Sequence, residues 1–149
     1  MQVIGFQFTK LHAERMPTFS KKSVYRNYHI EFTDLDKESI PFLSQQEGMK
    51  LFFTYTLSYG DEEKAHEKKE NTQGEISFEG FIVISLPEEE MKDFQKSWKK
   101  KAIPEEFQLP LSNFILNRCS IKALELGDLI NLPSHIPIPQ LTRQPTTTQ

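Results

Sequence analysis

Alternation of apolar and polar side chains predicts β-strands in the first half of the chain. A first strand is predicted from about Val3 to Glu14, and a second from about Tyr25 to Leu35. In both segments apolar side chains recur at every second position, which is typical of a strand that buries one face. The polar residues from Asp34 to Ser39 then predict a loop.

Two more strands are predicted further along. The third is the most regular, because apolar residues alternate with Phe52 and with small polar residues from Leu51 to Tyr59. Charged residues between Asp61 and Gly74 predict an exposed connection to the fourth strand, which runs from Ile76 to Leu86. Gly80 interrupts the apolar face of this strand and predicts a bulge or a close backbone approach.

The opposite faces of the third and fourth strands are also partly apolar. Phe52, Phe81 and Val83 lie there among polar residues. Because large exposed apolar surfaces mark interaction sites, these three residues are candidates for contact with other chains.

The first of two predicted helices has clear start signals. They are a capping serine, an early proline and a glutamate at capping-box spacing, namely Ser85, Pro87 and Glu88. An apolar stripe along this helix consists of Met91, Phe94 and Trp98. The lysines at 99–101 match the negative end of the helix dipole, which indicates a helix terminus rather than a phosphate-binding patch.

A second helix is predicted from Pro104 and is expected to kink or restart at Pro110, because proline removes a helical hydrogen bond. It is expected to end at Gly127. Its apolar residues cover more than one narrow stripe, so it has two surfaces to contact. One is its own sheet, and the other is either a partner subunit or further burial in the same domain. Prolines then favour an extended segment.

Length and charge limit the class of protein. A chain of 149 residues suits one domain, which we place at 1–142, followed by a disordered tail at 143–149. The chain contains eighteen Lys and Arg and twenty-one Asp and Glu, and no long block carries charge of one sign. A general electrostatic attraction to nucleic acid is therefore not supported. The twelve Phe residues are a large aromatic content, and aromatics dominate cores and interfaces.

Cysteine content and the apolar runs indicate a soluble cytoplasmic protein. Cys119 is the single cysteine, so an internal disulfide or a thiolate cluster for zinc is excluded, and a reducing compartment fits best. The N-terminus lacks the pattern of a signal peptide, and apolar runs such as Phe81 to Ile84 are much shorter than the roughly 20 residues of a membrane-spanning helix.

No motif for catalysis or metal binding is evident. The four histidines lie in separate predicted elements without metal-ligand spacing, namely His12, His29, His66 and His135. Cys119 sits in an apolar helix, where a thiol is usually a small buried hydrophobic group. Glycine-rich phosphate loops and nucleophile elbows are lacking. We therefore expect a protein that is not an enzyme and that carries no cofactor or metal.

The order of elements and several segments resemble the SecB export-chaperone family. The segments are Thr56 to Glu63 at the end of the third strand, Glu75 to Ile84 in the fourth, Ile103-Pro104, Leu132-Pro133, and the extended Ile136 to Pro139. The resemblance covers roughly residues 3 to 140. It implies an α+β fold, in which a four-stranded antiparallel sheet is followed by two helices. It also implies dimers that pair into tetramers.

The resemblance further implies a chaperone that holds unfolded or extended polypeptides in apolar grooves without ATP. The C-terminal Gln144 to Gln149 lacks the metal-binding tail that docks export chaperones on their motor protein, which argues against delivery to the secretion ATPase. A variant of this hypothesis is a chaperone that protects a single client, such as an antitoxin, as some relatives in the family do.

We therefore expect a holdase with polypeptide clients, without nucleic-acid partners or membrane insertion. The candidate client contacts are Phe52, Phe81, Val83, Met91, Phe94 and Trp98, since aromatic and methionine side chains adapt to varied apolar partners. The alternative is a non-enzymatic structural or adaptor subunit, whose apolar surfaces are permanently covered in an obligate complex. An enzyme of unrecognised type ranks last.

Overall fold

A computed structural model describes residues 1–20, 24–38, 46–61 and 72–143, and it contains four strands followed by two helices. The elements are β1 (Gln2–Arg15), β2 (Val24–Glu38), β3 (Gln46–Asp61), β4 (Thr72–Pro87), α1 (Glu88–Lys99) and α2 (Glu105–Leu129). The predicted α+β class, with four antiparallel strands before two helices, is confirmed.

The four strands form one antiparallel sheet in the order β1-β4-β3-β2. The central pair β3–β4 stays in register from Gln46 opposite Pro87 to Tyr59 opposite Gly74. The strands β1 and β2 lie at the two edges of the sheet, and each is irregular, with register shifts beside Gly5 and between Phe32 and Asp34. Such irregularities are frequent at sheet edges, where they bend the strand.

The loop expected from Asp34 to Ser39 is wrong in its first part, because β2 continues to Glu38. The register shift after Phe32 inserts an extra residue, so Leu35 returns to a position opposite Leu51 and the strand continues. The expected connection from Asp61 to Gly74 is too long at both ends, since Asp61 belongs to β3 and Thr72 begins β4. Its central part, residues 62–71, lies outside the described residues.

The start of α1 differs from the predicted capping box. Ser85 lies within β4 and is buried, opposite Gln2 and Gly48 in the ladders on its two sides. The residue before the helix is Pro87, and no side chain caps the first turn. Three glutamates in that turn, Glu88, Glu89 and Glu90, favour the positive end of the helix dipole instead.

The helix α2 runs without a break through Pro110, so the predicted restart is wrong. Proline removes one backbone donor, but Phe107 and Leu111 on either side of it are buried and hold the segment on the sheet. The helix ends at Leu129, two residues after the predicted end. Gly127 is in its last turn, where its carbonyl accepts the N–H groups of Ile130 at 3.3 Å and Leu132 at 2.9 Å.

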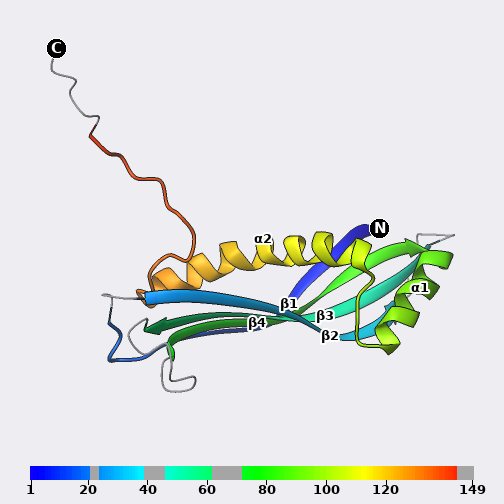
Figure 1. Cartoon of the computed structure of the whole chain (residues 1–149), viewed down its shortest axis with the longest axis horizontal. Helices are drawn as coiled ribbons and strands as arrows, with labels where there is room; N and C mark the ends of the chain where they lie inside the picture. The colour runs from blue at the N-terminus through cyan, green and yellow to red at the C-terminus, as the bar shows by residue number, and fades with distance from the viewer. Residues whose placement is uncertain (21–23, 39–45, 62–71, 144–149) are drawn as a thin grey trace, which may run out of the picture.

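The core lies between the two helices and one face of the sheet (Figure 1). From Leu51 to Tyr59 on β3 and from Gly74 to Ile84 on β4, every second residue is buried and the residues between them are not. The fully buried residues of largest volume are Tyr55, Tyr59, Phe53, Phe78, Phe94, Met49, Leu51, Leu57, Ile76, Ile82, Ile84 and Leu86. From α2, buried residues recur at intervals of four, namely Phe107, Leu111, Ile115, Cys119, Ala123 and Gly127. The helices therefore cover one face of the sheet only.

Gly80 fills the gap in the buried face of β4 that the sequence predicted as a close approach. A Cβ atom at this position would lie 2.4 Å from the carbonyl oxygen of Gln7 and 3.0 Å from the ring of Phe53. Neither neighbour can easily move away, because the Gln7 oxygen belongs to the backbone of β1 and the Phe53 ring is buried in the core. The close backbone approach is confirmed, and a register shift of β1 lies beside it, between Phe8 and Lys10.

We expect Gly80→Ala to lower the free energy of unfolding by about 1–3 kcal/mol, the usual cost of overpacking a tight site. The matched control is Gly127→Ala, where the new Cβ would have only ordinary contacts, the nearest at 3.4 Å from Ile76. This control should be neutral or slightly stabilising, because alanine is the better helix former. Urea unfolding followed by circular dichroism measures both changes, and a Gly80→Ala variant as stable as the parent would contradict the assignment.

Candidate functional site

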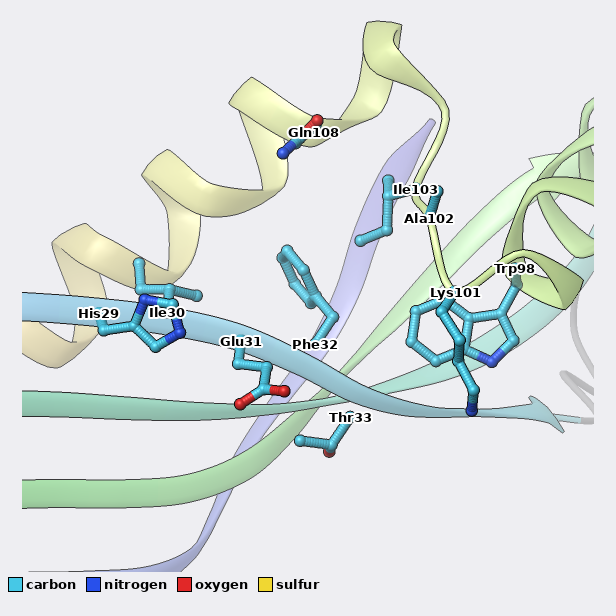
Figure 2. A pocket seen from close by; sticks show the side chains of 10 residues that line it. All are labelled: His29, Ile30, Glu31, Phe32, Thr33, Trp98, Lys101, Ala102, Ile103 and Gln108. Carbon is cyan, nitrogen blue, oxygen red and sulfur yellow. The ribbon is translucent and has the colours of Figure 1, made fainter.

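A cavity of about 730 Å³ lies between the edge strand β2 and the connection from α1 to α2 (Figure 2). Five consecutive residues of β2 border it on one side, and the end of α1, the connection and the start of α2 border it on the other. The lining residues are His29, Ile30, Glu31, Phe32, Thr33, Trp98, Lys101, Ala102, Ile103 and Gln108. We call this cavity the β2 groove. Its volume is typical of a ligand pocket.

Strand alternation places the apolar side chains of β2 inside the groove. Ile30 and Phe32 lie opposite Tyr55 and Phe53 of the buried face, so they point toward α2, whereas Glu31 points away from it (Figure 2). Both apolar side chains are partly buried and pack against the core. The floor of the β2 groove is therefore a half-exposed continuation of the hydrophobic core.

The other wall is set by the turn between the helices. The backbone of Lys101 is left-handed, with φ of 57°, and its N–H donates to the carbonyl of Trp98 at 2.7 Å. This turn ends α1 and directs Ile103 toward β2, while Gln108 approaches from α2 (Figure 2). The ammonium of Lys101 lies 5.5 Å from the centroid of the Trp98 ring, a cation–π distance.

A second, smaller cavity of about 230 Å³ adjoins the β2 groove. It is lined by Leu35, Asp36, Lys37, Met49, Gln95, Trp98 and Lys99. Trp98 borders both cavities. An extended segment along β2 would pass this ring.

The backbone of β2 is itself part of the site. Among the described strands, β2 pairs only with β3, so the backbone groups along its other edge point away from the sheet. An open strand edge is a ready template for pairing with another extended chain. Apolar side-chain positions and a free strand edge thus occur side by side at residues 29–33.

The six predicted contact residues do not come together in one site. Trp98 lines the β2 groove. Met91 and Phe94 lie in the core, with 1% and 0% of their surface exposed, because this part of α1 packs directly on the sheet. Phe52, Phe81 and Val83 lie on the face of the sheet opposite the helices, where each is partly exposed.

The three residues on the uncovered face form a small apolar patch. The rings of Phe52 and Phe81 face each other across β3 and β4, with centroids 5.6 Å apart. The ammonium of Lys50 lies 4.5 Å from the centroid of Phe81, and Val83 lies opposite Gly5 of β1. We call these residues the outer-face patch. It is separate from the β2 groove and belongs to the other side of the sheet.

Sequence reasoning did not identify Ile30, Phe32, Ile103 and Gln108 as site residues. The alternation in β2 correctly put Ile30 and Phe32 on one face, but it gave no sign that this face is only half covered. Ile103 was noted only within a segment that resembles the SecB family, and it lies in the connection between α1 and α2. No local pattern brings positions 30 and 103 together.

Within the described ranges, no group of three or more His, Cys, Asp or Glu side chains has a geometry that could hold a metal ion. The described helices also include none long and apolar enough to span a membrane. The thiol of Cys119, on the core-facing side of α2, is fully buried, and burial raises its pKa to about 12. A thiol in that state is a poor nucleophile, because the thiolate is the reactive form.

Comparison with solved structures identifies a related fold. The chain is similar to the Mycobacterium tuberculosis SecB-like chaperone Rv1957, solved in complex with a ChAD peptide from the HigA1 antitoxin Rv1956. The TM-score is 0.55 at 11% sequence identity, and the match covers 96% of this chain and 91% of that one. No protein-family model and no curated protein matches the sequence. The SecB-like fold that the sequence predicted is therefore confirmed.

We expect the Cys119 thiol to be unreactive in the folded protein. At pH 8, Ellman's reagent should label it at a negligible rate, and full labelling should follow addition of urea, which exposes the thiol and returns its pKa to the usual range. A free thiol such as glutathione under the same conditions is the control. Rapid labelling of the native protein would show that this side of α2 is not packed in the core.

Proposed function

We propose that this protein is a molecular chaperone that holds unfolded or extended polypeptide segments in the β2 groove. The observation that carries the proposal is the combination of an apolar groove with an open strand edge at residues 29–33. The similarity to a SecB-like chaperone whose structure contains a bound peptide supports it. The protein would act without nucleotide and without catalysis, because burial and backbone pairing supply the binding energy.

The proposed binding mode is strand addition. A client segment lies along β2 and pairs its backbone with the free edge, which gives affinity that is independent of sequence. Alternate side chains of the client then point into the groove, onto Phe32, Trp98 and Ile103. Apolar side chains are favoured there, because each one that leaves water contributes about 1.5–3 kcal/mol when fully buried.

The proposal extends to the location of the protein, its clients and a second contact surface. We propose a cytoplasmic chaperone with polypeptide clients, and the antitoxin peptide bound by the related structure favours a client-specific role. The outer-face patch of Phe52, Phe81 and Val83 is a second candidate contact surface for the same clients. Met91 and Phe94 would support the groove from the core and not contact the client, because they are buried.

The activity is tested by the suppression of client aggregation. Purified protein should suppress the light scattering of a chemically denatured client, diluted from guanidinium, at a near-stoichiometric ratio and without nucleotide. A structural or adaptor subunit with permanently covered surfaces would neither suppress aggregation nor bind a hydrophobic dye. Lack of suppression across several unrelated clients would therefore favour that alternative.

The β2 groove is tested by Ile103→Ser, which removes an apolar contact from its wall. We expect the affinity for an extended apolar peptide to fall about tenfold, since 1.4 kcal/mol is tenfold in the dissociation constant. Trp98 is the single tryptophan and borders the groove, so its fluorescence reports binding directly. The double variant Phe52→Ser/Phe81→Ser is the matched control for the outer-face patch. If this control loses more affinity than Ile103→Ser, clients bind the uncovered sheet face instead.

We also propose that the chain forms a homo-oligomer through α2. Leu109, Ile121 and Leu129 on this helix are 68%, 70% and 73% exposed, which is unusual for large apolar residues in one element. Light scattering coupled to size exclusion should give a mass of at least two chains. The variant Ile121→Asp should shift it toward one chain, because a buried carboxylate without a partner is costly. A parent protein that is monomeric at high micromolar concentration would refute this assembly.

A further inference from the structure

The end of α1 carries an unusual concentration of positive charge at the mouth of the β2 groove. Lys96, Lys99, Lys100 and Lys101 lie within six residues. None of the four forms an ion pair with a carboxylate of the described residues, whereas Lys92 pairs with Glu88 at 2.9 Å and Lys122 with Glu125 at 2.9 Å. The negative end of the helix dipole offsets about half a charge, so most of this charge is left for other partners.

Two of the lysines border the cavities that share the aromatic residue of the groove. Lys101 lines the β2 groove and lies over the ring of Trp98, and Lys99 lines the adjoining cavity, which Trp98 also borders. A segment that contacts Trp98 therefore comes near two cationic side chains. The left-handed backbone at Lys101 fixes this arrangement, because it turns the chain back toward β2 directly after the helix.

The carboxylates of β2 are directed mainly to the other side of the sheet. Glu31, Asp34 and Asp36 lie opposite Thr54, Phe52 and Lys50, which belong to the uncovered face of β3. Figure 2 shows Glu31 pointing away from α2, on the side opposite to Phe32. Among the residues that line the two cavities, the three lysines Lys37, Lys99 and Lys101 outnumber the two carboxylates Glu31 and Asp36. Two further glutamates, Glu105 and Glu106, lie in the first turn of α2.

We propose that the β2 groove selects client segments in which acidic side chains flank the apolar anchors. This inference rests on the proposed function and specifies its substrate class. An aromatic or aliphatic client side chain contacts Trp98, and aspartate or glutamate residues beside it in the client pair with Lys99 and Lys101. Segments with lysine or arginine at the flanking positions are disfavoured by repulsion from the same two groups.

The test uses three fluorescently labelled peptides with identical apolar anchors and capped ends. Their flanking residues are glutamate, glutamine or lysine, and acetylated and amidated ends remove terminal charges as a source of the effect. At about 50 mM salt we expect the glutamate peptide to bind about fivefold more tightly than the glutamine peptide, and the lysine peptide more weakly than both. The difference should shrink at 0.5 M salt, where screening is stronger.

The double variant Lys99→Gln/Lys101→Gln should bring the ratio of the affinities for the glutamate and glutamine peptides to about one, whatever loss of affinity the two peptides share. The matched control Lys10→Gln/Lys122→Gln removes the same charge from β1 and α2 and should keep the preference. Equal binding of the glutamate and glutamine peptides, or a preference that survives Lys99→Gln/Lys101→Gln, would overturn the inference and leave the proposed function intact. If the glutamine peptide does not bind at all, the proposed function fails, and the inference fails with it.

Discussion

The packing of both helices on a single face of the sheet is the constraint on which the other features depend. Successive side chains of a strand point to opposite faces, so each buried residue of β3 and β4 places its neighbours on the uncovered side. The burial of Phe53 and Ile82 under the helices therefore implies that Phe52 and Phe81 face outward. A two-layer domain of this kind covers its core with its own helices and leaves one sheet face to water or to other chains.

The β2 groove is a consequence of the same packing. The helices α1 and α2 lie over one face, and their short connection passes over the edge strand, where the sheet has no further strand to fill the space. Ile30 and Phe32 lie on the core-facing side of β2 and pack against the core. Because the connection covers them only in part, they form the floor of the groove. The site thus requires no special motif, and it is built from core-forming residues at the margin of the core.

Several features of the fold could be predicted because they depend on local patterns. Period-two alternation predicted four strands, and the gap at Gly80 predicted a close approach that the structure confirms. The errors occurred where distant partners override local signals. Ser85 is a residue type that often caps helices, but pairing with β1 and β3 holds it in the sheet. Pro110 does not break α2, because Phe107 and Leu111 on either side of it are buried against the sheet.

Local sequence patterns predicted the type and order of the elements and the two faces of the regular strands β3 and β4, because these depend on neighbours within a few positions. The register shifts in β1 and β2, which move the following residues to the other face, were not predicted. Tertiary structure alone decided which apolar residues stay accessible. Met91, Phe94 and Trp98 form one stripe on α1, yet the first two are buried and the third borders the groove, since the end of α1 lies beside the sheet edge. The approach of Phe32 and Ile103, which line one groove, likewise depends on the packing of segments about 70 residues apart, which no local pattern encodes.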